Sequence, residues 1–406
     1  MTTSPTTRPS RWPVWLCWLA MVLDGFDLVV LGTVIPTLLK TGELGFDAVG
    51  ATLAATISLV GVGLGALFIA PLSDKFGHRK LLFACVLWFS IFTIAVVWAP
   101  NVAVFSAFRL LAGLGLGACL PVALAYMNDY APSGSAGKST TRTMTGYHVG
   151  AVATAFLALM VIPDWRTMFV VGGLTGLALL PFLWFKLPET SPAERAARKE
   201  EQTTFRDLAK KPYPVVAAAI AAASFMGLLL VYGLNTWLPQ LMASAGYPVS
   251  AGLSLLLVLN LGAVAGLFIA GVLADRHGTK PIVLLWFGLS AVFLALLSFK
   301  VDNAILLNAL VFVTGVFVFS SQVLVYAWVS QLFPARLRAT ALGFAAGVGR
   351  VGAIAGPAVT GGLVAAGIAY PWGFYAFAAA GALAVVSLLT VPRAVASGQP
   401  AEERVS

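Results

Sequence analysis

The chain is built from runs of about twenty apolar residues, separated by short stretches that contain charged, proline or glycine residues. About 20 apolar residues in a helix span the hydrocarbon core of a bilayer. Because lipid offers the backbone no hydrogen bonds, only helices and closed barrels cross it. The sequence therefore predicts an all-α polytopic membrane protein with 12 transmembrane helices. The predicted spans are 14–39, 50–73, 81–99, 102–128, 143–162, 167–187, 214–240, 251–274, 281–299, 304–330, 338–363 and 371–391.

Composition excludes an ordinary soluble domain. Hydrophobic residues make up 59% of the chain and charged residues 10%, whereas soluble domains have about 45–50% and about 25%. The formal net charge of +9 does not indicate nucleic-acid binding, because the basic residues cluster in alternate loops. Cytoplasmic loops carry an excess of Lys and Arg. The pattern predicts a multi-pass protein of the cell (inner) membrane with both termini in the cytoplasm.

The spans form two sets of six, separated by the polar segment 188–213. We predict a cytoplasmic tail (1–13), an N-terminal six-helix bundle (14–187), a cytoplasmic linker (188–213), a C-terminal six-helix bundle (214–392) and a second cytoplasmic tail (393–406).

The two sets also repeat each other. PLSDKFGHRK at 71–80 matches VLADRHGTKP at 272–281, and GTVIPTLL at 32–39 matches NTWLPQLM at 235–242. The offset stays close to 202 residues, which predicts two pseudo-symmetric six-helix bundles with the substrate between them near mid-membrane. Small residues allow the close helix contacts that a rocking motion needs. The candidate pairs are Gly61/Gly65, Gly113/Gly117, Gly343/Gly347 and Gly352/Gly356.

Two carboxylates lie well inside a predicted span, Asp24 and Asp27, three residues apart on span one. A charge at the bilayer centre costs at least about 2.5–3.5 kcal/mol, so it usually faces an aqueous pathway and has a function. Neighbouring carboxylates repel each other when both are ionised, which favours binding of a proton. We predict a proton-coupling site here, with a structural carboxylate pair as the alternative.

Two arginines are also intramembrane, Arg109 on span four and Arg350 on span eleven. A guanidinium presents a planar fork of donors that fits a carboxylate. We predict that Arg350 anchors an organic anion, with Gly349 and Gly352 leaving the backbone open beside it. The alternatives are a permanent interhelical salt bridge for Arg109 and helix pairing for Arg350.

Other polar and aromatic residues in the spans are candidates for substrate binding. His148 stands 202 residues before Arg350 and could donate to a carboxylate or relay a proton. Aromatic rings suit a benzene ring, and amides suit polar groups; packing or lipid contact is the alternative for each. These candidates are Tyr147, Tyr232, Trp237, Tyr326, Asn235, Asn260 and Gln322.

The loop at 71–80 and its echo, GVLADRHGTK at 271–280, resemble the signature loop of the major facilitator superfamily. FRLLAGLGLG, with Arg109, resembles the arginine motif of proton-coupled members. The resemblance implies the major facilitator fold and places span four beside span one, where Arg109 would pair with Asp27. It also implies that loop charges act as gates, with an ordinary solvated turn as the alternative. The gating candidates are Asp74, Arg79, Asp129, Asp275 and Arg276.

Three further stretches are similar to the aromatic acid:proton symporter family: DGFD at 24–27, NTWLPQLMASAGY at 235–247 and RATALGFAAGVGRVGAIAGP at 338–357. His148 departs from that family's pattern, in which a small or apolar residue is expected.

The resemblance implies proton-coupled uptake of a small aromatic carboxylate, such as benzoate or a hydroxybenzoate, by alternating access. The alternatives are a porter or exporter of another small organic acid and, more remotely, a transporter-derived membrane sensor. The chain has no P-loop, HExxH or GxSxG motif, so we do not expect an enzyme. We expect no cofactor beyond the proton as coupling ion, no nucleic-acid partner, and function as a monomer in the bilayer.

Overall fold

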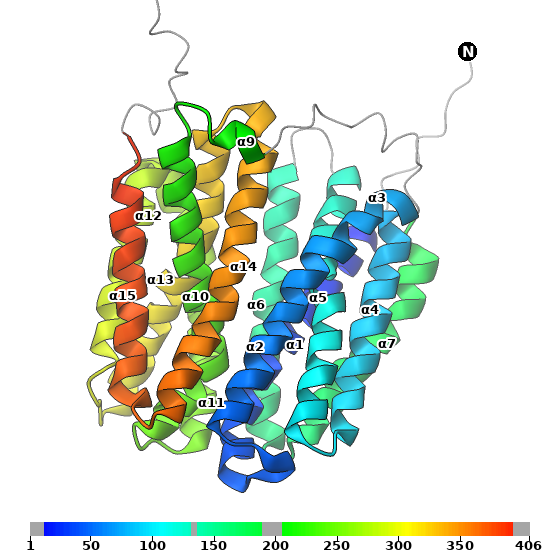
Figure 1. The fold of residues 1–406 in the computed structure, drawn as a ribbon, viewed down its shortest axis with the longest axis vertical. Helices are drawn as coiled ribbons and strands as arrows, with labels where there is room; N and C mark the ends of the chain where they lie inside the picture. The colour runs from blue at the N-terminus through cyan, green and yellow to red at the C-terminus, as the bar shows by residue number, and fades with distance from the viewer. Residues whose placement is uncertain (1–11, 131–135, 189–204, 393–406) are drawn as a thin grey trace, which may run out of the picture.

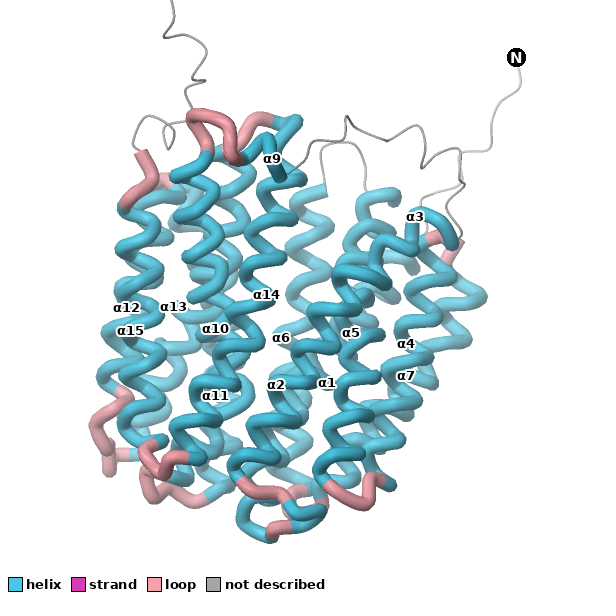
Figure 2. The backbone as a smooth tube through the Cα atoms, viewed as in Figure 1, coloured by secondary structure: helices cyan, strands magenta, loops and turns pink. Residues whose placement is uncertain are grey.

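Twelve long helices form two bundles in the computed structural model, which describes residues 12–130, 136–188 and 205–392 (Figure 1). Figure 2 shows helices joined by short loops, and the described residues contain no strand. The N-terminal half contains α1 (Trp12–Thr41), α2 (Ala48–Leu64), α4 (His78–Ala95), α5 (Val102–Tyr130), α6 (Ala136–Val161) and α7 (Trp165–Lys186). The C-terminal half contains α10 (Pro214–Ser244), α11 (Val249–His277), α12 (Thr279–Leu296), α13 (Ala304–Leu332), α14 (Ala335–Ala365) and α15 (Ala369–Leu389).

The predicted spans correspond to these helices. Among the described residues, eleven helices are long and apolar enough to cross a membrane, and the part of α6 counted there, Thr145–Val161, is a shorter apolar helix. The second span is less regular than predicted, because α2 continues through a π-helical turn (Gly65–Ile69) and a 3₁₀ turn (Ala70–Leu72) before the short α3 (Ser73–Phe76). Another short helix, α9 (Phe205–Leu208), lies in the predicted linker.

Equivalent glycines pack equivalent helices within each half. On Gly61 of α2, a Cβ would lie 2.3 Å from the carbonyl oxygen of Leu110 on α5. On Gly262 of α11, 201 residues later, it would lie 2.1 Å from the carbonyl oxygen of Phe312 on α13. Such backbone contact is possible only without a side chain, so the repeat seen in the sequence is a repeat of helix packing.

The glycine pairs that we predicted at contacts between the two moving halves lie elsewhere. Three of the four glycine pairs pack inside a half: Gly61/Gly65 and Gly113/Gly117 join α2 to α5, and Gly352/Gly356 join α14 to α10. A Cβ on Gly343 or Gly347 would meet nothing within 4 Å. These glycines thus allow close helix packing inside each half.

Among the described residues, the halves meet mainly through three helix pairs, α1 with α10, α2 with α14, and α6 with α11. We call the end of the molecule with α3 and α9 the linker end, and the opposite end the far end (Figure 1). A Cβ on Gly32 of α1 would lie 2.0 Å from the carbonyl oxygen of Asn235 on α10, and one on Gly361 of α14 would lie 2.1 Å from Oγ1 of Thr52 on α2. Both contacts lie toward the far end, and α2 and α14 diverge toward the linker end, where Gly343 and Gly347 adjoin open space.

Candidate substrate and proton-coupling site

Asp27 and Arg109 form a buried ion pair between α1 and α5. Arg109 Nη1 lies 2.8 Å from Asp27 Oδ1, and the side chains are 1% and 3% exposed. Arg109 Nη2 also donates to the carbonyl oxygen of Asp27 (3.0 Å) and to Oγ of Ser58 (3.3 Å). Thr93 of α4 donates to the same carboxylate oxygen (3.2 Å). The predicted contact between spans one and four is therefore present.

Each residue of the ion pair also has a buried polar atom that makes no hydrogen bond to the described residues. Among the described residues, Oδ2 of Asp27 and Nε of Arg109 are buried without a hydrogen-bond partner. Polar contacts from three helices fix the pair, as a desolvated pair requires, while Oδ2 remains an unused acceptor. Sequence reasoning missed Ser58 and Thr93, because a single hydroxyl in an apolar span carries no distinguishing pattern.

Asp24 lies one helical turn before Asp27 and is 3% exposed. Its carboxyl interacts electrostatically with Arg350 of the opposite half and with Asp27. The two carboxylates predicted as one site therefore have different surroundings: Asp27 is ion-paired with Arg109 of α5, and Asp24 lies within electrostatic range of Arg350 on α14.

Arg350 contacts Tyr232 of α10 and is partly exposed. Its Nη1 donates to the Tyr232 hydroxyl oxygen at 3.1 Å, and the residue falls between the buried and exposed classes. Arg109, by contrast, is 1% exposed. Tyr326 of α13 is also partly exposed and lies within electrostatic range of Arg350. A partly exposed arginine between the halves has donors to offer an anion.

The prediction that Gly349 and Gly352 open the backbone beside Arg350 is wrong. A Cβ on Gly352 would lie 2.0 Å from the carbonyl oxygen of Phe225, and one on Gly349 would lie 2.8 Å from Cδ1 of Leu228. Both glycines instead allow α14 to pack closely on α10.

His148 lies at the interface between the halves. Its ring makes edge contacts with Tyr147 (5.2 Å between centroids) and with Phe319 of α13 (5.8 Å). It is 6% exposed, and among the described residues its Nδ1 is buried without a partner. Phe319 was missed by sequence reasoning, because an apolar span does not reveal which of its aromatic residues faces the other half.

The remaining candidates are buried residues of the C-terminal half, and one of them, Asn235, also adjoins α1 of the N-terminal half. Trp237 is fully buried, and its Nε1 donates to the carbonyl oxygen of Pro357 at 3.0 Å. Asn260 Nδ2 donates to Oδ1 of Asn235 at 3.1 Å, and both residues are at most 1% exposed. Oε1 of Gln322 would lie 2.1 Å from a Cβ on Gly227. Among the described residues, Nδ2 of Asn235, Oδ1 of Asn260 and both amide atoms of Gln322 are buried without a hydrogen-bond partner. A substrate-binding role for these residues and for Trp237 stays a prediction.

The predicted gate residues lie at the linker end. Asp275 and Arg276, at the end of α11, are exposed. The guanidinium of Arg79 stacks on the ring of Trp184 at 4.8 Å. The side chains of Asp74 and Asp129 lie outside the described residues. No ion pair among the described side chains joins Arg79, Asp275 or Arg276 to a partner, so their gating role stays a prediction.

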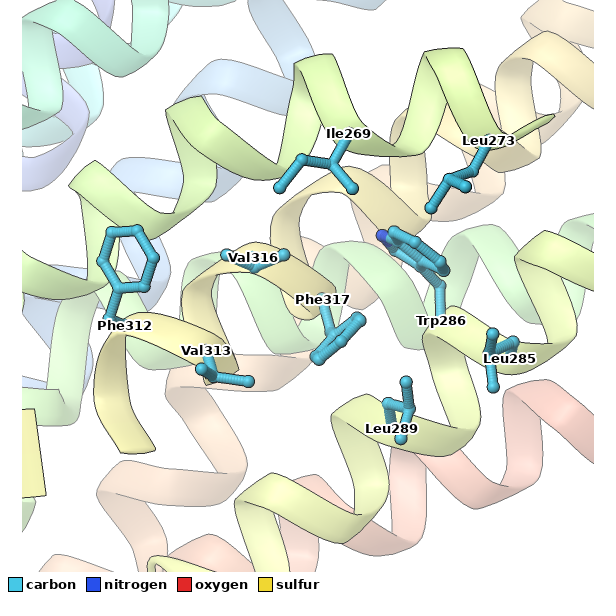
Figure 3. A pocket seen from close by; sticks show the side chains of 9 residues that line it. All are labelled: Ile269, Leu273, Leu285, Trp286, Leu289, Phe312, Val313, Val316 and Phe317. Carbon is cyan, nitrogen blue, oxygen red and sulfur yellow. The ribbon is translucent and has the colours of Figure 1, made fainter. Parts of the chain in front are cut away.

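A separate apolar groove lies between α11, α12 and α13 (Figure 3). Its lining is hydrophobic throughout and includes the exposed side chains of Ile269, Leu285 and Phe312. The indole N–H of Trp286 in this lining already donates to Oγ of Ser320 at 2.7 Å, and the groove suits contact with lipid. The charged residues between the halves are the better candidate site.

Comparison with known proteins agrees with this architecture. The family model described as Major Facilitator Superfamily matches residues 17–270 and 254–405. The chain is 35% identical to the gentisate transporter of Corynebacterium glutamicum, covering 93% of this chain and 86% of the relative. It is 32% identical to the benzoate transport protein of Acinetobacter baylyi, covering 94% and 89%.

A crystal structure of a D-xylose-proton symporter has the same fold, with a TM-score of 0.76 at 17% identity, covering 95% of this chain and 98% of that chain. With the family match across nearly the whole sequence, this chain belongs to the Major Facilitator Superfamily and is a transporter, not an enzyme.

Proposed function

We propose that this protein takes up a small aromatic carboxylate, such as benzoate or a hydroxybenzoate, together with protons. It would do so by alternating access in the cell (inner) membrane, with the linker end in the cytoplasm. The relatives named for gentisate and benzoate support the substrate class. Contact between the halves toward the far end supports an inward-open arrangement of this conformation.

The different surroundings of the two intramembrane arginines carry this proposal. Arg109 is neutralised by Asp27 at 2.8 Å. Arg350 makes its hydrogen bond to a neutral phenol and is partly exposed between the halves. A cation held in a low-dielectric site strongly favours an anion that reaches it. A carboxylate substrate meets that need.

The surroundings of Asp24 support proton coupling. When Asp24 is ionised, its charge compensates that of Arg350 across the interface. A substrate carboxylate at Arg350 would then leave an excess negative charge between the halves. Protonation of Asp24 removes that excess, so each ligand favours binding of the other, which is the reciprocity that coupling requires. Protonation of Asp27 would break its ion pair with Arg109, which offers a second way to couple a proton to a change of conformation.

Uptake by purified protein in liposomes tests the proposal. Radiolabelled benzoate, 4-hydroxybenzoate and 2,5-dihydroxybenzoate are offered with an inside-alkaline pH gradient, with benzamide as the neutral control. We expect at least one acid to accumulate, and a protonophore to abolish its accumulation. The proposal would be contradicted if none of the three acids is taken up. It would also be contradicted if an acid accumulates to the same level with and without the pH gradient.

A further inference from the structure

Tyr232 keeps a hydrogen-bond donor available beside Arg350. Its oxygen accepts from Nη1 of Arg350 at 3.1 Å, and a phenol that accepts through its oxygen still has its own proton to donate. The guanidinium carries five N–H donors, and this contact uses one of them. Because Tyr232 is 8% exposed and Arg350 is partly exposed, an anion reaching Arg350 also meets the phenol.

Tyr147 presents a second phenol from the opposite half. Its hydroxyl is buried and makes no hydrogen bond of good geometry among the described residues, although the side chain of Asn235 on α10 lies close to it; Tyr147 is 9% exposed. The ring of the next residue, His148, contacts Phe319 of α13 at 5.8 Å between centroids, so this turn of α6 packs against the C-terminal half, which carries Tyr232 and Arg350. Tyr147 lies within electrostatic range of both residues and of Asp24. The backbone fixes this position, because a Cβ on Gly25, next to Asp24, would lie 2.0 Å from the carbonyl oxygen of Tyr147.

An unpartnered buried hydroxyl is costly. Leaving such a group without a hydrogen bond costs about 1–3 kcal/mol. The cost is recovered when a ligand supplies the acceptor. A carboxylate has two oxygens with about four lone-pair sites, which is enough for the guanidinium and both phenols.

From these positions we infer that Arg350, Tyr232 and Tyr147 form one carboxylate receptor assembled from both halves of the transporter. This inference rests on the proposed function and assigns the two tyrosines a role through their hydroxyls rather than their rings. Tyr232 and Arg350 supply the donors of the C-terminal half, and Tyr147 supplies the donor of the N-terminal half.

Because Tyr232 and Tyr147 belong to different halves, they should affect different steps of transport. Tyr232 reaches the carboxylate wherever Arg350 does, so it contributes to binding in every conformation. Tyr147 reaches the same carboxylate only when the halves enclose it. Tyr147 therefore links occupancy of the site to closure, and closure precedes translocation.

Substitution by phenylalanine separates hydroxyl from ring, because it removes the oxygen and keeps the aromatic surface. Calorimetry measures binding of benzoate, 4-hydroxybenzoate and 2,5-dihydroxybenzoate to wild type, Tyr232→Phe and Tyr147→Phe. We expect about tenfold weaker binding for each variant, the size of one lost hydrogen bond to a charged group. Counterflow at saturating acid should slow for Tyr147→Phe and stay near wild type for Tyr232→Phe.

Tyr370→Phe is the matched control. The Tyr370 hydroxyl is also buried without a partner among the described residues, but it lies near the far-end start of α15. Its variant should bind the acids as wild type does. The melting temperature of ligand-free Tyr147→Phe should equal or exceed that of wild type, because an unsatisfied hydroxyl is removed. A hydroxyl with a structural role would lower the melting temperature instead.

The outcomes separate this inference from the proposed function. If wild type binds none of the acids, the proposed function fails. If wild type binds an acid and both phenylalanine variants bind it within twofold, the receptor is refuted while the function stands. The same refutation follows if Tyr370→Phe weakens binding as much as Tyr147→Phe does.

Discussion

The two intramembrane arginines, one in each half, differ in exposure and in how their charge is compensated. Arg109, in the N-terminal half, is enclosed by Asp27, Ser58 and a backbone carbonyl. Arg350, in the C-terminal half, is partly exposed and contacts a neutral phenol. A charge in the membrane needs compensation. Arg109 thus has its counter-charge hydrogen-bonded within the same half, whereas the counter-charge within electrostatic range of Arg350, Asp24, belongs to the opposite half, so a ligand carboxylate can take its place.

Breaking the buried Asp27–Arg109 ion pair should have the largest effect on transport and on stability. Asp27→Asn leaves Arg109 buried without a counter-charge, which costs about 3–5 kcal/mol of stability, and it removes a titratable group from α1. We expect proton-driven accumulation to be abolished and the melting temperature to fall. Asp27→Asn combined with Arg109→Gln should recover stability without recovering accumulation. If Asp27→Asn alone still accumulates acid with the pH gradient, Asp27 is not part of the coupling.

Arg350→Ala should mainly affect binding. The side chain is partly exposed, so its loss should change the melting temperature little, whereas acid binding should weaken about 100-fold through loss of charge-assisted hydrogen bonds. Calorimetry with benzoate and benzamide measures the difference. Equal losses for the acid and the amide would assign Arg350 a structural role and remove the contrast with Arg109.

Gly32→Val should affect movement more than binding. The new Cβ would stand 2.0 Å from the carbonyl oxygen of Asn235 and 3.0 Å from Cα of Thr236, and backbone atoms cannot move aside cheaply. We expect far-end closure to fail and uptake to fall at least about tenfold, with equilibrium binding of benzoate retained. The matched control is Gly343→Val, because a Cβ there meets nothing within 4 Å. Equal uptake by both variants would show that the α1–α10 contact does not limit transport.

The smallest effect concerns the far-end loop, outside the membrane helices. Hydrogen bonds from Trp165 (3.1 Å) and Arg166 (2.9 Å) lower the pKa of Glu43 below its ordinary value. A lowered pKa in the folded state adds stability at neutral pH that is lost as pH falls through that pKa. Because the ion pair is about 40% exposed, the contribution should be about 1 kcal/mol or less. Glu43→Gln should lower the melting temperature slightly at pH 7 and leave it unchanged in acid; an equal shift at both pH values would contradict this.

The features predictable from the sequence were those that lipid itself imposes. Spans are recognisable because backbone groups in lipid need helices. That intramembrane charges need partners was also predictable, but the choice of Arg109 as the partner of Asp27 came from the family resemblance. The orientation of Trp237, Gln322 and the glycines was not predictable. In a soluble helix, polar residues mark the outer face, but in these spans the lipid-facing and packing faces are both apolar. Arg350 could be proposed as an anchor from the sequence, but its contact with Tyr232 could not, because the two residues are 118 positions apart in the chain.

Proton uptake on ligand binding tests the central claim most directly. Titration of wild type with benzoate in buffers of different ionisation enthalpy counts the protons taken up per bound acid. We predict proton uptake with wild type, because Asp24 must lose its charge when a carboxylate reaches Arg350. Asp24→Asn should bind benzoate with no proton uptake. Equal proton uptake by wild type and Asp24→Asn would contradict the account.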